Sequence, residues 1–275
     1  MTTTAHSPHE LTVAVCPVDI AFGNVEANIA AARHAILDAH VKADIYVLPE
    51  LFSTGYSNSP EAMHALASPD DGAAAAAVAE IARLTDAAVC GSFAAKDSDG
   101  RCYNRAFFTE PSGHTTTYDK RHLFSMSSEA QVFGQGHSRP PAVMFRGWRV
   151  AMCVCYDLRF PAWMRNTAAT DTGALDYAYD IMLMPANWPS ARAYALEHLL
   201  IARAIENQAP IVCGNRSGED PYGRYDGCSY AFDWMGRPAF APGTTCATFS
   251  LDSLLRDRSR FAAVRDADSF TFDNM

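Results

Sequence analysis

Hydrophobic and polar positions along the chain follow two periods, one typical of strands and one typical of helices. Short apolar runs rich in β-branched and aromatic residues recur, and each is followed by polar or turn-forming positions. Residues 24–40 and 191–208 lie between such runs and carry apolar side chains at helical spacing. The alternation predicts an α/β fold. The predicted strands occupy residues 11–16, 45–48, 87–93, 105–109, 150–155, 181–184 and 211–214.

Turn-forming sequences add antiparallel hairpins to this pattern. Residues 110–113 place Pro and Gly between two strand-like segments, and residues 233–237 have similar turn chemistry. Such hairpins argue against a purely parallel, doubly wound sheet. We therefore expect a sandwich of mixed sheets with helices outside, in one domain over residues 10–272, and a flexible N-terminus over residues 1–9.

Composition and charge limit the kinds of molecule that this protein is expected to bind. The chain has 275 residues, of which 49% are hydrophobic, and a formal net charge of −9. Its 22 Lys and Arg residues are scattered, so no surface for nucleic acid or an anionic membrane is indicated. The N-terminus lacks the pattern of a secretion signal, and the Ala-rich residues 72–79 are too few to cross a bilayer. We expect a cytoplasmic enzyme whose partner is a small molecule.

The eight cysteines are spread over the whole chain, four of them inside strand-like runs. This distribution is typical of reduced core thiols. Cys153 and Cys155 have like parity on one predicted strand, which leaves open a metal or redox module. No second cysteine pair or suitably spaced His completes a tetrahedral site, so we expect no metal and no cofactor.

Three chemically active side chains stand where predicted strands end. Glu50 follows the run 45–48, Lys120 follows a β-like stretch, and Cys155 ends the apolar run 150–155. A side chain at such a turn is lifted off the edge of the sheet, where nucleophiles are often found. Taken one at a time, each residue has a plainer interpretation: a buried thiol, a solvated turn or a surface charge.

Together the three residues suit nucleophilic catalysis. A thiol with an ordinary pKa of about 8.5 is mostly protonated at neutral pH, so it needs a base such as Glu50. Lys120 would favour the thiolate and then stabilise the oxyanion formed when sulfur attacks a carbonyl carbon. The backbone N–H of Tyr156 is a second candidate donor to that oxyanion.

Five ordered segments resemble the carbon-nitrogen hydrolase (nitrilase) superfamily. These segments are residues 48–52, 118–124, 155–161, 186–189 and 202–208, and the resemblance extends over nearly the whole chain from about residue 10. It implies an α-β-β-α sandwich, with Glu50 as general base, Lys120 in the oxyanion site and Cys155 as nucleophile. Glu129 falls where the family has a second glutamate that orients the substrate or the lysine; its plainer interpretation is a charge at a helix N-terminus.

Among the branches of this superfamily, the sequences of the motifs are most similar to those of the ω-amidases. Those enzymes hydrolyse the terminal amide of 2-oxoglutaramate or 2-oxosuccinamate to a 2-oxo dicarboxylate and ammonia. Arg159 or Arg192 would then hold the substrate carboxylate, although Arg159 also suits an ion pair with Asp157. The resemblance also suggests a homodimer. The candidate substrate-binding residues are Tyr156, Asn187, Trp188, Arg159 and Arg192.

Two departures from the ω-amidase pattern bear on the substrate. Residues 167–176 form a longer stretch that we expect to alter the rim of the pocket, and residues 261–268 lack the usual Pro. A nitrilase, another aliphatic amidase or an N-carbamoyl amino acid hydrolase would use the same Glu, Lys and Cys. A protein that keeps the fold but only binds a metabolite is a further alternative.

Overall fold

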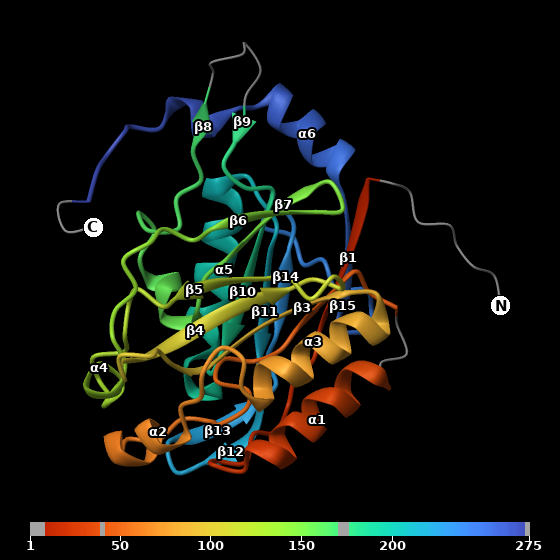
Figure 1. Ribbon diagram of the computed structural model, residues 1–275. Coiled ribbons are helices and arrows are strands. Elements are labelled where there is room, and N and C mark those ends of the chain that lie inside the picture. Colours follow the sequence, from red (N-terminus) through yellow and green to blue (C-terminus); the bar gives the residue numbers. More distant parts are fainter. Residues whose placement is uncertain (1–8, 39–41, 170–175, 273–275) are drawn as a thin grey trace.

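The computed structural model describes residues 9–38, 42–169 and 176–272. Its largest sheet has six strands and is mixed (Figure 1). β1, β2 and β3 pair in parallel, whereas β15, β4 and β5 pair antiparallel to their neighbours. In order across the sheet the strands are β15 (Cys246–Ser250), β1 (Glu10–Val15), β2 (Ile45–Val47), β3 (Ala88–Lys96), β4 (Cys102–Thr109) and β5 (Thr115–Asp119).

A five-stranded mixed sheet faces the first one, with β10 against β2 and β3. Its central strands β7, β10 and β11 are parallel, and its outer strands β6 and β14 are antiparallel to them. The order is β14 (Tyr230–Phe232), β11 (Ile211–Asn215), β10 (Ile181–Ala186), β7 (Trp148–Met152) and β6 (Ala142–Phe145). Two small ribbons pair β12 (Ser217–Asp220) with β13 (Gly223–Asp226), and β8 (Ala168–Ala169) with β9 (Asp176–Tyr177).

Helices cover both outer faces of the two sheets. α1 (Val25–Leu37) and α3 (Ala73–Thr85) pack together against the six-stranded sheet, and α5 (Ala193–Asn207) packs against β11 and β14 (Figure 1). This layering confirms the predicted α-β-β-α sandwich. The remaining helices are α2 (Pro60–Leu66), α4 (Glu129–Val132) and α6 (Leu251–Arg260), with the 3₁₀ turns η1 (Cys155–Arg159), η2 (Ser190–Arg192) and η3 (Ala263–Asp266).

Strand alternation explains why the first sheet is buried on both faces. Val13 and Val47 belong to the core between the sheets, whereas their neighbours Ala14 and Tyr46 belong to the core under α1 and α3. Successive side chains of a strand point to opposite faces, so each strand supplies both cores. Each fully buried Val or Ile contributes about 1.5–3 kcal/mol, which makes these two cores the main source of stability.

Helix prediction was correct for two helices and incomplete for the others. The predicted helix 24–40 appears as α1, begun by Asn24, whose side chain accepts from the N–H of Ala27. The predicted helix 191–208 appears as η2 and α5. α3 and α6 were missed, although each has a distinct apolar face. Across the described ranges, no helix combines the length and apolar character that a membrane span requires.

Two expectations concern residues at the edges of the described ranges. Of the N-terminal residues 1–9, expected to be flexible, all but His9 lie outside the described part of the chain. Of residues 167–176, residues 170–175 also lie outside it, and the flanking β8 and β9 pair with each other. None of the described residues of this stretch lines the pocket, and the expectation that the stretch alters the rim depends on residues 170–175, outside the described range.

Candidate active site

The sandwich brings the three predicted catalytic residues to one pocket. Glu50 stands three residues beyond β2, and Lys120 directly follows β5 in the same sheet. Cys155 begins η1, which follows β7 of the other sheet. β2 and β5 run in the same direction, so their carboxyl ends lie at one edge and the two sheets together form the site.

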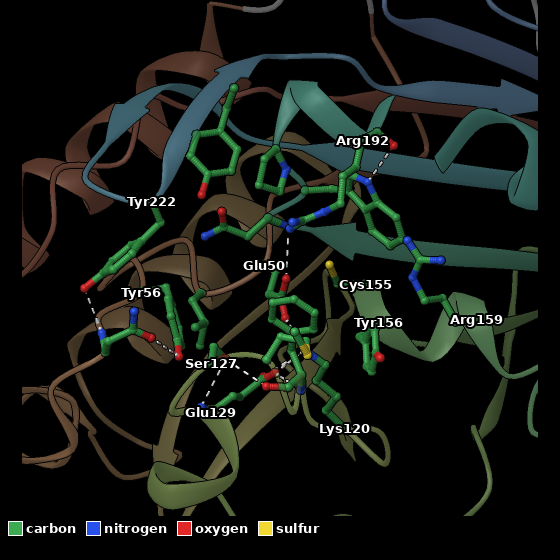
Figure 2. Close-up of a pocket in the computed structure, with 18 residues that line it drawn as sticks. Glu50, Tyr56, Lys120, Ser127, Glu129, Cys155, Tyr156, Arg159, Arg192 and Tyr222 are labelled. Carbon is green, nitrogen blue, oxygen red and sulfur yellow. Dashed lines mark hydrogen bonds and ion pairs between the residues drawn. The ribbon is translucent and has the colours of Figure 1, made fainter. Parts of the chain in front are cut away.

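The pocket has a volume of about 530 Å³. All nine residues predicted to form the site line it, namely Glu50, Lys120, Glu129, Cys155, Tyr156, Arg159, Asn187, Trp188 and Arg192. In Figure 2, Cys155 lies near the centre, with Lys120 and Glu129 below it and Arg159 and Arg192 to the right and above. The two ends of the pocket therefore differ in charge.

Glu50 is held by three donors. Its Oε1 accepts from Lys120 Nζ at 2.8 Å and from Asn104 Nδ2 at 2.8 Å, and its Oε2 accepts from the Asn187 N–H at 2.9 Å. Only 4% of the residue is exposed. A buried carboxylate with this many donors is fixed in position, and its Oε2 keeps room for one more proton.

Lys120 and Glu129 complete a buried charge cluster. Lys120 Nζ donates to both oxygens of Glu129, at 2.8 and 3.0 Å, and the N–H of Phe124 also donates to Glu129. Burial by itself lowers the pKa of Lys120, but the negative charges of Glu129 and Glu50 outweigh it and hold that pKa well above its ordinary value. Glu129 begins α4, as its plainer interpretation required, yet its carboxylate turns to the lysine.

Cys155 adopts a left-handed backbone conformation, with φ of 41°. Such a conformation costs a residue with a side chain about 1–3 kcal/mol and is found where a site needs it. The predicted strand 150–155 ends earlier, at Met152, because the chain turns here into η1. Burial, followed by the negative charge of Glu50, raises the pKa of the Cys155 thiol well above its ordinary value. Both effects favour the neutral thiol over the thiolate.

The two arginines lie over aromatic rings and form no ion pair with any described residue. The Arg159 guanidinium is 4.9 Å from the ring centre of Trp188, and that of Arg192 is 5.4 Å from the ring centre of Phe124. The alternative ion pair between Arg159 and Asp157 was wrong, because Asp157 is bonded to Tyr118 and His122 instead. Both guanidiniums remain available to an anion.

Tyr156, Asn187 and Trp188 also line the pocket. The Tyr156 ring packs edge-on against Phe124, with ring centres 5.1 Å apart. Trp188 Nε1 donates to the carbonyl of Arg192 at 3.0 Å, which places its ring. Both polar atoms of the Asn187 side chain are buried and have no partner among the described residues, so they can bond to a ligand.

The sequence reasoning missed Asn104, which joins the two glutamates. Its Nδ2 donates to Glu50 at 2.8 Å and to Glu129 at 3.0 Å, and its Oδ1 accepts from the hydroxyl of Ser92 at 2.9 Å. Asn is disfavoured in strands, so its presence in the middle of β4 was a usable signal. The tyrosines that line the opposite wall, Tyr56, Tyr222 and Tyr225, were also missed.

Cys153, considered for a metal or redox site, is fully buried in the core between the sheets. Burial raises the pKa of its thiol well above the ordinary value. Within the described ranges, no group of three or more His, Cys, Asp or Glu has the arrangement that a metal ion needs. Cys153 therefore has the environment of a packed core thiol.

Comparison with known proteins agrees with this geometry. The sequence model of the carbon-nitrogen hydrolase family matches residues 12–252. The chain belongs to the carbon-nitrogen hydrolase family. Omega-amidase YafV from Yersinia enterocolitica is 39% identical over 259 residues, or 90% of this chain and 93% of that protein. The 2-oxoglutaramate amidase of Bacillus subtilis is 30% identical over 227 residues, or 82% of this chain and 84% of that protein.

A solved structure extends the similarity to three dimensions. A CN-hydrolase superfamily protein from Xanthomonas campestris, with an arsenic adduct in its active site, has a TM-score of 0.88 and 34% identity, and the match covers 96% of this chain and 99% of that one. These matches confirm the family and the sandwich fold predicted from the motifs. As a carbon-nitrogen hydrolase, the chain is an enzyme that acts on C–N bonds other than peptide bonds.

Proposed function

We propose that this carbon-nitrogen hydrolase is an ω-amidase, which hydrolyses the terminal amide of a 2-oxo acid such as 2-oxoglutaramate or 2-oxosuccinamate. The products are a 2-oxo dicarboxylate and ammonia. Relatives named omega-amidase and 2-oxoglutaramate amidase support this choice, since they match most of the chain at 39% and 30% identity. The charge distribution of the pocket supports it independently.

The observation that carries the proposal is the contrast between the acidic and the basic groups that line the pocket. Glu50 and Glu129 are both bonded to Lys120 and Asn104, so neither is free for a cationic substrate. Arg159 and Arg192 form no ion pair with any described residue. The pocket thus suits a substrate that carries a carboxylate at the end away from the amide.

The same contrast argues for a 2-oxo acid over an amino acid. Glutamine and asparagine carry an α-ammonium, and a site that buries it needs a carboxylate or several acceptors nearby. Glu50 and Glu129 are the only acidic side chains that line the pocket among the described residues, and both already have partners. A 2-oxo group accepts hydrogen bonds and needs donors instead, and the side-chain amide of Asn187 supplies one.

The catalytic residues would act in two stages. In the first, Glu50 takes the proton of the Cys155 thiol as sulfur attacks the amide carbon, and Lys120 with the Tyr156 N–H stabilises the oxyanion. Glu50 then passes the proton to the departing ammonia and leaves a thioester on Cys155. In the second, Glu50 activates water, which attacks the thioester and releases the acid.

The charge of the cluster explains why a base is needed. With Cys155 protonated, the two carboxylates and the ammonium sum to a formal charge of −1 in a buried site. A resting thiolate would bring this to −2, which desolvation strongly disfavours. The proton therefore leaves sulfur during attack, when the electron pair moves on to the substrate.

The test is ammonia release from 2-oxoglutaramate, measured beside glutamine, butyronitrile and N-carbamoyl-alanine. We expect selective turnover of the oxo-amide, and we expect Cys155→Ala to lower it by roughly 10⁴-fold or more without unfolding the chain. A Cys153→Ala variant is the matched control, because it removes a buried thiol two residues away. Turnover of another substrate alone, or retained activity in Cys155→Ala, would overturn the proposal.

A homodimer, suggested by the family resemblance, and a cytoplasmic location remain part of this proposal. Large apolar side chains near α5 and α6 are exposed, among them Tyr194 at 76% and Phe261 at 71%. Exposed apolar side chains are common at interfaces between subunits. Light scattering of the purified protein gives the mass that decides between one copy and two.

A further inference from the structure

Asp157 is a buried carboxylate that the catalytic mechanism does not use. Its residue exposure is 0%, and it lies two residues beyond the nucleophile in η1. A fully buried negative charge is costly unless hydrogen-bond donors surround it, so the partners of Asp157 indicate its role. These partners come from two separate parts of the active site.

One part is the turn that carries the nucleophile. Asp157 Oδ2 accepts from the Val154 N–H at 3.1 Å, and the Asp157 N–H donates to the Val154 carbonyl at 2.9 Å. These two bonds enclose Cys155, whose backbone is left-handed. A residue keeps such a conformation only where its surroundings hold it firmly, and Asp157 is the side chain that does so here.

The other part is the segment that carries the catalytic lysine. Asp157 Oδ2 accepts from the Tyr118 hydroxyl at 2.9 Å, and Oδ1 accepts from the His122 N–H at 3.0 Å and lies 2.8 Å from His122 Nδ1. Tyr118 and His122 stand two residues before and two residues after Lys120. One carboxylate is thus hydrogen-bonded to residues on both sides of Lys120 in the chain.

Aromatic packing fixes this connection from outside. The His122 ring stacks on Phe160 with ring centres 3.7 Å apart and an interplanar angle of 8°. Trp163 Nε1 donates to the Tyr118 hydroxyl at 2.8 Å. Phe160 directly follows η1 and Trp163 lies three residues further on, so the segment after the nucleophile also contacts the lysine segment.

We infer that Asp157 is a positioning residue that sets the distance and direction between Cys155 Sγ and Lys120 Nζ, with Tyr118 and His122 acting through it. Nucleophile and oxyanion donor come from different sheets, and Asp157 is bonded to both segments. A displacement of about 1 Å at such a site lowers turnover by about a hundredfold. The inference rests on the proposed roles of Cys155 and Lys120.

The test compares Asp157→Asn with Tyr118→Phe. Asparagine keeps the shape, but its amide nitrogen cannot accept a hydrogen bond, so we expect kcat to fall about a hundredfold with KM within about twofold. Tyr118→Phe removes one donor, and we expect about a tenfold loss of kcat. Since Tyr118 acts through Asp157, the double variant should be no slower than Asp157→Asn alone.

The matched control is Asp180→Asn. Asp180 is also a buried carboxylate, bonded to Arg258 at 2.8 Å, but it precedes β10, at the end of that strand away from the pocket. We expect this variant to lose thermal stability and to keep kcat. Rates are compared at a temperature where circular dichroism shows every variant folded.

Labelling of Cys155 by iodoacetamide, followed by mass spectrometry, separates this inference from the proposed function. Even if no 2-oxo amide is a substrate, we expect labelling in Asp157→Asn to be about tenfold slower than in the native chain. The inference would be overturned if Asp157→Asn kept the native kcat and labelling rate, or if it changed only KM. An equal loss of kcat in Asp180→Asn would also overturn it. Should Asp157→Asn not fold, a native kcat in Tyr118→Phe would overturn it.

Discussion

The two ends of the pocket are built from different kinds of interaction. At the Glu50 end, buried carboxylates and one ammonium bond to each other and to Asn104, at distances of 2.8 to 3.0 Å. At the other end, Arg159 and Arg192 are exposed residues whose guanidiniums lie over aromatic rings. Groups that already have partners are held ready for one reaction, whereas a partly hydrated cation exchanges partners at low cost.

This difference separates chemistry from substrate choice. Changes at the buried end should lower kcat for every amide, because they alter groups that act in the transition state. Changes at the exposed end should raise KM only for substrates that carry a carboxylate. Substitutions at each end test that separation, and the pH dependence of the thiol tests the need for a base at the buried end.

The largest effect is expected from Lys120→Met. Loss of one oxyanion donor typically lowers turnover by about 10²- to 10³-fold, so kcat should fall by that factor on charged and uncharged amides alike. Two unpaired buried carboxylates remain, so the free energy of unfolding should drop by about 3–5 kcal/mol. Steady-state kinetics and urea unfolding measure the two effects, and a KM change without a kcat change would contradict the assignment.

A smaller effect is expected from Arg159→Gln and Arg192→Gln. Hydrogen bonds to a charged group contribute about 1.5–3 kcal/mol, so the arginine that holds the carboxylate should raise KM for 2-oxoglutaramate by roughly 10- to 150-fold. Butyramide lacks a carboxylate and is the control substrate, for which neither variant should differ from the native chain. Equal losses on both substrates would mean that these arginines support the pocket without selecting its ligand.

The smallest effect, when it is expressed per pH unit, concerns the pH dependence of the thiol. Because burial and Glu50 raise the Cys155 pKa, the protonated form persists to higher pH than for a free cysteine. Labelling of Cys155 by iodoacetamide should therefore rise by about tenfold per pH unit from pH 6 to pH 9, without a plateau. A plateau below pH 7 would indicate a preformed thiolate and would remove the need for Glu50 as base.

Much of the fold was predictable because strand and helix periods survive in the sequence. The hairpin around residues 110–113 was expected and pairs β4 with β5. α3 and α6 were missed, although the sequence of each helix carries an apolar face, with Val78 and Ile81 buried in α3 and Leu254 buried in α6. α3 packs this face against the six-stranded sheet.

The catalytic residues were predictable because each stands at a strand end within a motif that a family shares. The hydrogen-bond partners of Asn104 and Asp157 were not predictable, because they lie far away in the chain. Asn104 bonds to Glu50, which is 54 positions away, and Asp157 bonds to Tyr118, which is 39 positions away.

Sequence by itself determined the family, the layered α/β architecture and the choice of Glu50, Lys120 and Cys155 as catalytic residues. Local hydrophobic patterns and motif sequences carry that information. Only the tertiary structure decided how these residues are held. Close approach is one example: at Gly214 an added methyl would lie 3.0 Å from the Val47 carbonyl of the facing sheet. Distances and hydrogen-bond partners between segments arise when the sheets pack, so no single stretch of sequence contains them.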